Sequence, residues 1–406
     1  MISSDNESLA ALSLERSKAV PLDITLDMSE AQGRARFSDL LTPHIQNTAA
    51  LKLTYLTTAN DLAQTFPDFP ESMPNLRSLA LSRWRHERQW DPSIDPFKSF
   101  PPSLRCLSLD RIPLYPSLLS LRNLREFASH DPDSDLSPDT LLTFLEENRL
   151  LKRMVLNIGF ARSTSNGLQH RAPIKNQLTH LSVTSRNTKG IRSFISSIPL
   201  KTGADLRIHC FSGDGGLNSA LLGIPATDFQ NLQSPTRMHI HKTVIRSSGP
   251  NGSFQLKYSL LWEEPLVRLP LLSFNSIQEL YLNGYFKKFN PSIFPALKTL
   301  AVERDGLPQR TLSTLFSSPE SLPSLKTLVF LGCGLSEAFM ESLAQFAFER
   351  KNTAFASLGR VVIVHENREP LNAESIRTVE RHVSVVDVRP SGGMPEDLKW
   401  CREGGD

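Results

Sequence analysis

The sequence predicts a mixed α/β solenoid, in which short parallel strands line one face and helices and loops cover the other. Three observations predict this fold. An octet of the form L-x-x-L-x-L recurs along the chain, the copies follow one another at similar distances, and the residue two positions after the middle apolar residue is usually apolar as well. The clearest copy is Pro323-Ser-Leu325-Lys-Thr-Leu328-Val-Phe330.

The middle apolar residue of each octet marks one repeat. Eight of the eleven spacings between successive markers are 20 to 28 residues, close to the period of about 20–29 residues of a leucine-rich repeat. This spacing predicts an irregular leucine-rich-repeat horseshoe with its strands on the concave face and helices and loops on the convex face. The markers are Leu51, Leu79, Leu107, Phe127, Met154, Leu181, Leu206, Met238, Leu280, Leu300, Leu328 and Val361.

Alternation of apolar and polar residues, as in Leu79-Ala-Leu81, predicts a short strand with one buried face. One such strand cannot bury that face by itself, whereas a stack of strands shares a continuous core. Stacking also lets a chain of 406 residues exceed the usual size limit of a single compact core. We therefore expect the marker residues to line a common interior.

Residues 1–20 are expected to form a short helix followed by a linker, because Pro21 favours extended backbone before it. Leu22-Asp-Ile-Thr-Leu26 alternates and is expected to be the first strand. A helix is predicted over Ser38–Ile45, and the next strand over Ala50–Leu53.

Several connections between strands carry the signals of helices. Ser137 is followed by proline and aspartate, which is typical of a helix start, and the apolar pattern continues to Asn148. Ser336–Lys351 has the strongest apolar stripe at helical spacing. Weaker patterns predict helices over Lys189–Ile198 and Ala373–Arg381.

The gap between the markers Met238 and Leu280 is too long for one repeat. Gly249-Pro-Asn-Gly252 is a turn signal between two alternating segments, so we expect an inserted hairpin near residues 241–262. A division into two domains near residues 240–270 is the alternative.

The repeats are expected to span residues 21–390. They end in a strand over Val383–Val388, which would close the solenoid because a last repeat needs a cap over its apolar surface. Residues 391–406 contain two glycine pairs and are expected to form a flexible tail.

Composition narrows the class of protein. The net charge of +3 is too small to indicate nucleic-acid binding, which requires a concentrated basic face. The four cysteines are scattered without a C-x-x-C pair, which favours reduced thiols in the cytoplasm or nucleus. The start is not of the secretory type, and no apolar run approaches the length of about 20 residues that spans a membrane.

Residues that flank the buried positions of each strand are expected on the concave face, where solenoids commonly bind partners. If Leu206 and Met238 mark adjacent strands, Arg207 lies beside His239 and His209 beside His241. Three interpretations of these histidines stay open: a weakly cationic patch for acidic peptides, a zinc site, or solvated polar residues. We predict no metal and no cofactor, and a partner-binding set of Arg153, His180, Arg207, His209, Arg237, His239, His241, Glu279 and Tyr281.

Signals of enzymatic activity are weak. Ser212-Gly-Asp-Gly-Gly216 lacks the lysine of a phosphate-binding loop. Glu263 and Glu264 are adjacent, so on a strand their side chains would point apart and could not act as a pair. No G-x-S-x-G or H-E-x-x-H motif occurs. We predict a non-enzymatic protein-binding module; the alternative is an enzyme built on β-repeats that acts on a nucleotide or carbohydrate.

Four segments also carry a family resemblance. The first three are Leu14-Glu-Arg-Ser-Lys-Ala-Val-Pro-Leu-Asp-Ile24, Leu41–Ile45 with Leu51-Lys-Leu53, and Met73–Leu81. The fourth is the C-terminal Leu325–Leu328 strand with its helix and the closing Val383–Val388 strand. Together these segments are similar to the fungal family of F-box proteins with irregular leucine-rich repeats. The resemblance covers residues 12–390.

The resemblance implies a role in ubiquitin transfer. In such proteins an F-box, a small helical module, docks on the adaptor of a cullin ubiquitin ligase, and the repeats hold the substrate. Only a few residues precede the matching run here, so residues 1–20 are expected to be a remnant of the linker and the F-box itself to be missing. A ligase adaptor is expected as a partner only if an F-box exists upstream.

Overall fold

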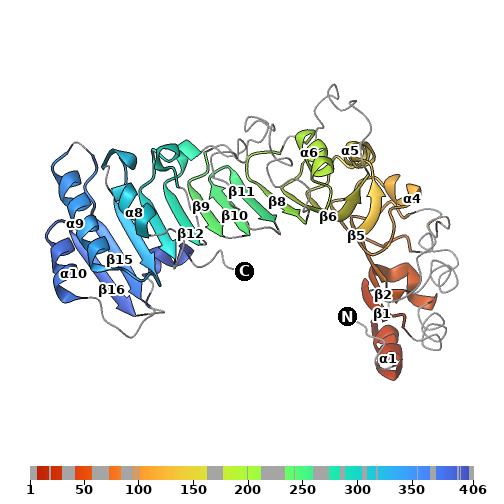
Figure 1. Cartoon of the computed structure of the whole chain (residues 1–406). Helices are drawn as coiled ribbons and strands as arrows, with labels where there is room; N and C mark the ends of the chain where they lie inside the picture. The colour runs from red at the N-terminus through yellow and green to blue at the C-terminus, as the bar shows by residue number, and fades with distance from the viewer. Residues whose placement is uncertain are drawn as a thin grey trace. The chain divides into compact units, whose positions relative to one another are not determined.

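The computed structural model describes residues 7–17, 20–29, 42–56, 73–83, 95, 97, 100–161, 177–198, 200–211, 234–241, 243–258, 274–283, 289–303, 309–316, 319–353, 355–365, 372–390, 393 and 395–401. The chain divides into two compact units, residues 1–199 and 200–406. This boundary lies outside the 240–270 region that the long gap between markers had suggested. Each unit is mixed α/β and is built on parallel strands (Figure 1).

In unit 1 the strands follow one another in sequence order, and each pairs in parallel with the next. This is the arrangement that repeated strand–connection units produce when each strand packs beside its predecessor. The strands are β1 (Leu22–Asp27), β2 (Thr48–Leu56), β3 (Ser78–Arg83), β4 (Cys106–Asp110), β5 (Glu126–Leu136), β6 (Arg153–Phe160) and β7 (His180–Ser185).

Two helices of unit 1 begin behind a capping side chain. The Ser137 side chain accepts a hydrogen bond of 3.1 Å from the Thr140 amide, and Asn187 accepts one of 3.1 Å from the Gly190 amide, which satisfies donors at each helix start. The helix expected over Ser38–Ile45 is described only from residue 42, where it is a 3-10 helix. The elements are α1 (Glu7–Ser17), η1 (Thr42–Asn47), α4 (Pro116–Leu119), α5 (Pro138–Glu147) and α6 (Thr188–Ser196).

The strands of unit 2 follow the order β8-β11-β10-β9-β12-β13-β14-β15-β16. The β9–β10 and β10–β11 pairs are antiparallel, and the other pairs among these described strands are parallel. The strands are β8 (Ala204–Cys210), β9 (Arg237–His241), β10 (Val244–Gly249), β11 (Gly252–Tyr258), β12 (Glu279–Asn283), β13 (Thr299–Glu303), β14 (Thr327–Leu331), β15 (Arg360–His365) and β16 (Val385–Pro390).

The predicted hairpin is confirmed as β10–β11, but it is not an appendage. It lies within the sheet between β8 and β9, with β11 parallel to β8 and β10 antiparallel to β9. Both hairpin strands alternate, with Ile245 and Leu256 fully buried, so they share the core of their neighbours. The expectation that the strands marked by Leu206 and Met238 are adjacent is therefore wrong.

Helices cover one side of the C-terminal strands (Figure 1). Phe330 of β14 meets Phe339 of α9 edge-on at a ring distance of 5.4 Å, and Phe316 of α8 packs on Phe346 of α9 at 4.9 Å. The helical elements of unit 2 are η6 (Phe274–Ser276), η7 (Pro291–Ile293), α8 (Gln309–Phe316), η8 (Pro319–Ser321), α9 (Glu337–Lys351), α10 (Ala373–Glu380) and η9 (Glu396–Cys401). Within the described residues, none of the helices is both long and apolar enough to cross a membrane.

The marker residues lie in register inside each unit, as predicted. Leu79 is paired with Leu107, and Leu300 with Leu328; all four are at most 2% exposed. Each therefore adds to a row of apolar side chains that runs across the strands, which is how strands too short to be stable separately share one interior.

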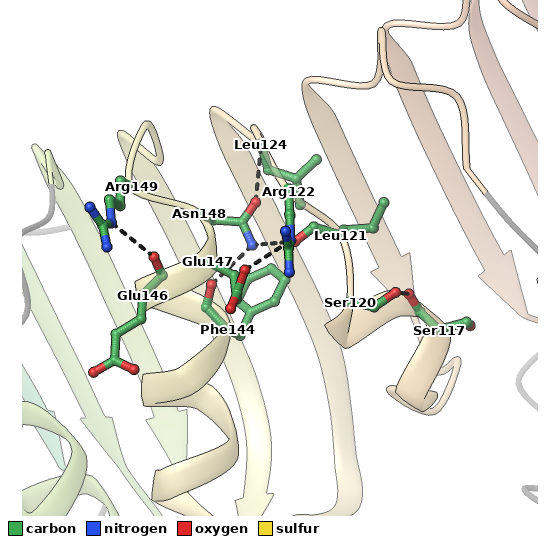
Figure 2. Close-up of polar contacts among 10 residues, drawn as sticks. All are labelled: Ser117, Ser120, Leu121, Arg122, Leu124, Phe144, Glu146, Glu147, Asn148 and Arg149. Atoms are coloured by element: carbon green, nitrogen blue, oxygen red, sulfur yellow. Dashed lines mark hydrogen bonds and ion pairs between the residues drawn. The ribbon is translucent and has the colours of Figure 1, made fainter.

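Loops between the repeats are held by buried polar side chains. Figure 2 shows Asn148, at the C-terminal end of α5, between Leu121, Leu124 and Phe144. Its amide accepts a hydrogen bond from the Leu124 amide and donates to the carbonyl oxygens of Leu121 and Phe144 at 2.7 and 2.9 Å. Buried backbone groups that lack a ladder partner need such side chains, because water does not reach them.

Candidate functional site

Each sheet has two faces. We call the side to which the marker residues point the core face, and the other side the opposite face. Because side chains alternate along a strand, the opposite face carries the residues expected on a concave binding surface. Phe330 points to the core face, where it meets α9, so Val329 and Leu331 belong to the opposite face.

On unit 1 the opposite face carries polar residues near the ends of the strands. Arg153 of β6 pairs with His180 of β7 in the sheet register, and the neighbouring position on β5 is Glu126. The Asn157 amide lies 3.0 Å from the His130 ring one strand away. Arg153 and His180 are therefore neighbours, as expected from the sequence, but they belong to a different unit from the remaining predicted site residues.

On unit 2 the hairpin changes which residues meet. Arg207 lies beside Gln255, and His239 lies beside Arg246. The expected neighbours Arg207 and His239 are separated by the two hairpin strands, and so are His209 and His241. The hairpin thus replaces a predicted histidine cluster by an alternating row of cationic and polar side chains.

A pocket opens on this face above β8, β11, β10 and β9. Its volume is about 240 Å³, enough for one or two side chains of a partner rather than a large cofactor. Three arginines, one histidine and one tryptophan dominate its wall. The lining residues used below are Arg207, Arg237, His239, Arg246, Asp205 and Trp400.

Acidic side chains contact arginines of this pocket. Arg207 contacts Asp205 at 2.9 Å, and Arg237 contacts Glu279 of β12. Arg246 adds a third guanidinium beside His239. Three guanidiniums gathered in one pocket favour an anionic ligand group.

His239 is electrically neutral at neutral pH. Burial first, and then the charges of Arg246 and Arg237, lower its pKa from 6.5 to about 4. Its Nδ1 atom is buried and has no hydrogen-bond partner among the described residues. The ring packs against Tyr281 at 5.5 Å and against the Trp400 ring at 5.3 Å, so it joins the arginine-lined pocket to an aromatic cluster.

The other two histidines of the expected cluster are separate from it. His209 packs on Phe211 at a ring distance of 4.1 Å, and burial together with Lys257 lowers its pKa. His241 is exposed at the end of β9. Among the described residues, no group of three or more histidine, cysteine, aspartate or glutamate side chains is placed to hold a metal.

Tyr281 and Glu279 lie where the polar part of the face ends. Tyr281 is only 6% exposed, and its hydroxyl donates a hydrogen bond to Glu303. From this position to β15, the equivalent residues Ala301, Val329 and Val362 are apolar and fully buried. Tyr281 is therefore part of an apolar floor.

Residues of the expected flexible tail cover that floor. Residues 396–401 form η9, and Leu398 and Trp400 are 4% and 8% exposed. They join Tyr281, Ala301, Val329, Leu331, Val362 and Val364 in one buried cluster. Glycine content indicated mobility, but burial of two large apolar side chains outweighs the loss of chain entropy.

Sequence reasoning missed Arg246, Gln255, Lys257 and Trp400. The first three lie on the hairpin, which the sequence predicts only as an insertion between repeats. The alternation in Ile245-Arg-Ser-Ser and Phe254-Gln-Leu256-Lys is nevertheless typical of sheet strands. The burial of Trp400 depends on contacts with residues far away in sequence, such as His239 on β9. No local pattern near Trp400 predicts those contacts.

No protein-family model matches the chain. A comparison with curated proteins gave no match either. Among solved structures, the leucine-rich-repeat-containing protein LegL7 from Legionella pneumophila is similar, at 12% identity over 92% of each chain, with a TM-score of 0.24. That score is too low to establish a common fold, so the repeat architecture rests on strand order, register and burial within each unit.

Proposed function

We propose that this chain is a non-enzymatic leucine-rich-repeat module that binds a protein partner on the opposite face of its sheet. The observation that carries this proposal is the pocket over β8, β11, β10 and β9, where Arg207, Arg237 and Arg246 surround the neutral ring of His239. Planar guanidiniums on a rigid sheet suit carboxylates of a partner, because each can donate two hydrogen bonds.

The chemistry of the pocket favours binding over catalysis. Asp205 pairs with Arg207 and accepts a hydrogen bond of 2.5 Å from Ser253, so it is held as an ion-pair partner rather than poised as a base. The pocket opens on a broad sheet of strand-borne side chains, which is the arrangement that repeat proteins use for extended contacts. We therefore favour a protein-binding module over an enzyme that acts on a nucleotide or carbohydrate.

The resemblance to F-box proteins makes the proposed partner more specific. If an F-box is joined to this chain in the gene product, the same face would present the substrate of a cullin ubiquitin ligase. The module would then act in the cytoplasm or nucleus, without nucleic acid or membrane. The binding face would be the same in either form.

An acidic peptide tests the proposed function directly. The probe is a labelled peptide of aspartate, glutamate and serine, compared with a lysine-rich peptide of equal length, and binding is followed by fluorescence anisotropy. Wild type should bind the acidic peptide more tightly, and the affinity should fall with added salt because partly exposed charges are screened.

Substitutions localise the binding. The double variant Arg237→Gln/Arg246→Gln should weaken binding of the acidic peptide by about tenfold, or about 1.4 kcal/mol. The control is Arg149→Gln, an exposed arginine outside the sheet (Figure 2), which should leave the affinity unchanged. Equal binding of the acidic and basic peptides, or an unchanged affinity in the double variant, would contradict the proposed function.

A further inference from the structure

The segment Pro395–Trp400 lies on the opposite face of unit 2 as a ligand would lie in a groove. Leu398 and Trp400 enter the buried cluster formed by β12, β13, β14 and β15, whereas Glu396 and Lys399 are exposed and contact each other at 2.5 Å. One side of the segment is thus buried and the other faces solvent. In Figure 1 it is the dark blue piece beside β12.

Charged and aromatic contacts hold the segment at its two ends. Asp397 contacts Arg360 of β15 at 2.5 Å. At the other end, the guanidinium of Arg237 lies 5.9 Å above the Trp400 ring, a distance at which a cation is attracted to an aromatic face. The segment therefore connects β15 to the arginine-lined pocket on β9.

The floor beneath the segment is adapted to an apolar occupant. At equivalent positions in the register, β8, β11, β10 and β9 carry Arg207, Gln255, Arg246 and His239, whereas β12 to β15 carry Tyr281, Ala301, Val329 and Val362. The change from polar to apolar occurs where the segment begins to cover the sheet. An uncovered row of this kind would be an exposed apolar surface, which soluble proteins avoid unless it is a binding site.

The segment is attached to the sheet by side chains. Among the described strands, the ladder between β15 and β16 ends at Pro390, and η9 closes on itself through the bond from the Leu398 amide to the Pro395 carbonyl at 3.0 Å. Gly393 lies in the connection. Release of the segment would therefore leave the pairing of the described strands intact.

We propose that the floor formed by β12 to β15 is a peptide-binding groove that the chain's own C-terminal segment fills. The partner that fits it presents an acidic residue, a leucine at the next position and an aromatic residue two positions later, as Asp397, Leu398 and Trp400 do. This inference deepens the proposed function, on which it rests, by naming the chemistry of the partner. Binding of that partner requires release of the internal segment.

The test uses the full chain with the two apolar anchors removed. The probe is a labelled synthetic peptide of residues 394–400, and its affinity for wild type is compared with that for Leu398→Ser/Trp400→Ser by anisotropy. The double variant should bind at least about tenfold more tightly, because its groove is no longer filled. A peptide with the same two substitutions should bind neither protein. A folded double variant that binds no more tightly than wild type would overturn the inference.

A second variant covers the case in which the double variant does not fold. Asp397→Arg removes one exposed ion pair and keeps both apolar anchors, so the native fold is retained. It should bind the peptide about two- to fivefold more tightly than wild type. Adding Arg360→Asp to this variant restores the internal pair and places a repelling charge opposite the peptide, so binding should fall below the wild-type level. Equal affinities in these three proteins would also overturn the inference.

The two proposals fail in different ways. Loss of acidic-peptide binding in Arg237→Gln/Arg246→Gln reports on the pocket over β9 and β10. Binding of the 394–400 peptide that requires Leu398 and Trp400 reports on the floor over β12 to β15. If the acidic peptide does not bind but the 394–400 peptide does, the proposed pocket is wrong and the groove stands. The reverse result leaves the pocket in place and identifies the segment as a permanent part of the fold.

Discussion

The backbone amide of Leu124 donates a hydrogen bond of 3.0 Å to the side-chain oxygen of Asn148, which lies 24 residues later in the chain (Figure 2). Asn148 is fully buried, and its nitrogen donates to the carbonyls of Leu121 and Phe144. One side chain therefore supplies three hydrogen bonds to backbone groups of two successive repeats. Such a residue connects neighbouring repeats more than it stabilises its own helix.

Replacing Asn148 by alanine should lower the free energy of unfolding. The Leu124 amide and the Leu121 carbonyl would lose the bond to this side chain, whereas the Phe144 carbonyl keeps its bond from the backbone amide of residue 148. Each unsatisfied group costs about 1–3 kcal/mol before relaxation or water entry. We expect the free energy of unfolding to fall by about 3 kcal/mol, measured by urea denaturation. Asn352→Ala is the matched control, because Asn352 also follows a helix but is exposed; it should change stability by less than about 1 kcal/mol. Similar effects of the two substitutions would contradict this role.

Arg350 connects repeats in the same way from α9. It is fully buried, and its guanidinium donates to the carbonyls of Leu322, Leu325 and Ala356 at 2.6 to 3.0 Å. Arg350→Met keeps much of the volume but removes this donor from the carbonyls of Leu325 and Ala356, while the Leu322 carbonyl keeps its bond from the Leu325 amide. The free energy of unfolding should therefore fall by about 3 kcal/mol. The exposed neighbour Lys351, replaced by Met, is the control. A stability loss no larger than the control's would show that water replaces the guanidinium.

His239 should make the fold sensitive to acid. Its pKa is about 4 in the folded chain, against an ordinary value of 6.5, so the unfolded chain binds the proton more readily. The contribution of His239 to the free energy of unfolding is fully present above about pH 6.5 and decreases as the pH drops. Below about pH 4 the whole contribution, up to about 3 kcal/mol, is lost. His239→Gln should lose less stability than wild type over that interval, as measured by urea denaturation at both ends.

His241 provides the comparison for His239. It lies on the same strand with an exposed side chain, so His241→Gln should retain the acid sensitivity of wild type. If both variants change the pH dependence equally, the burial of His239 between the arginines is not its cause.

Replacing Gly190 of α6 by alanine has two opposing effects on stability. Helix propensity alone predicts that Gly190→Ala stabilises the helix by about 1 kcal/mol. However, a Cβ atom at this position would lie 2.3 Å from the Cβ of Phe160, so the helix or strand would have to move. Overpacking of this kind costs about 1–3 kcal/mol, and we expect a lower melting temperature. At Gly334 an added Cβ meets nothing within 4 Å, so Gly334→Ala should not show this loss.

The sequence by itself determined the repeat strands, their core residues and most helix starts. Period-two alternation decides which side of a strand is buried, and Leu79, Leu107, Leu300 and Leu328 are buried in register as it requires. Serine and asparagine caps act within one turn, so Ser137 and its equivalents could be recognised from neighbouring residues. Both signals are local, so they can be recognised without knowledge of the rest of the chain.

Tertiary structure alone decided the candidate site. Whether β10–β11 lies inside or outside the sheet depends on which strand edges pair, and that choice separated Arg207 from His239 and placed Arg246 beside His239. The position of Trp400 depends on an apolar floor assembled from four strands. Both outcomes come from contacts between residues far apart in sequence, whose free energy is gained only once the sheet has formed.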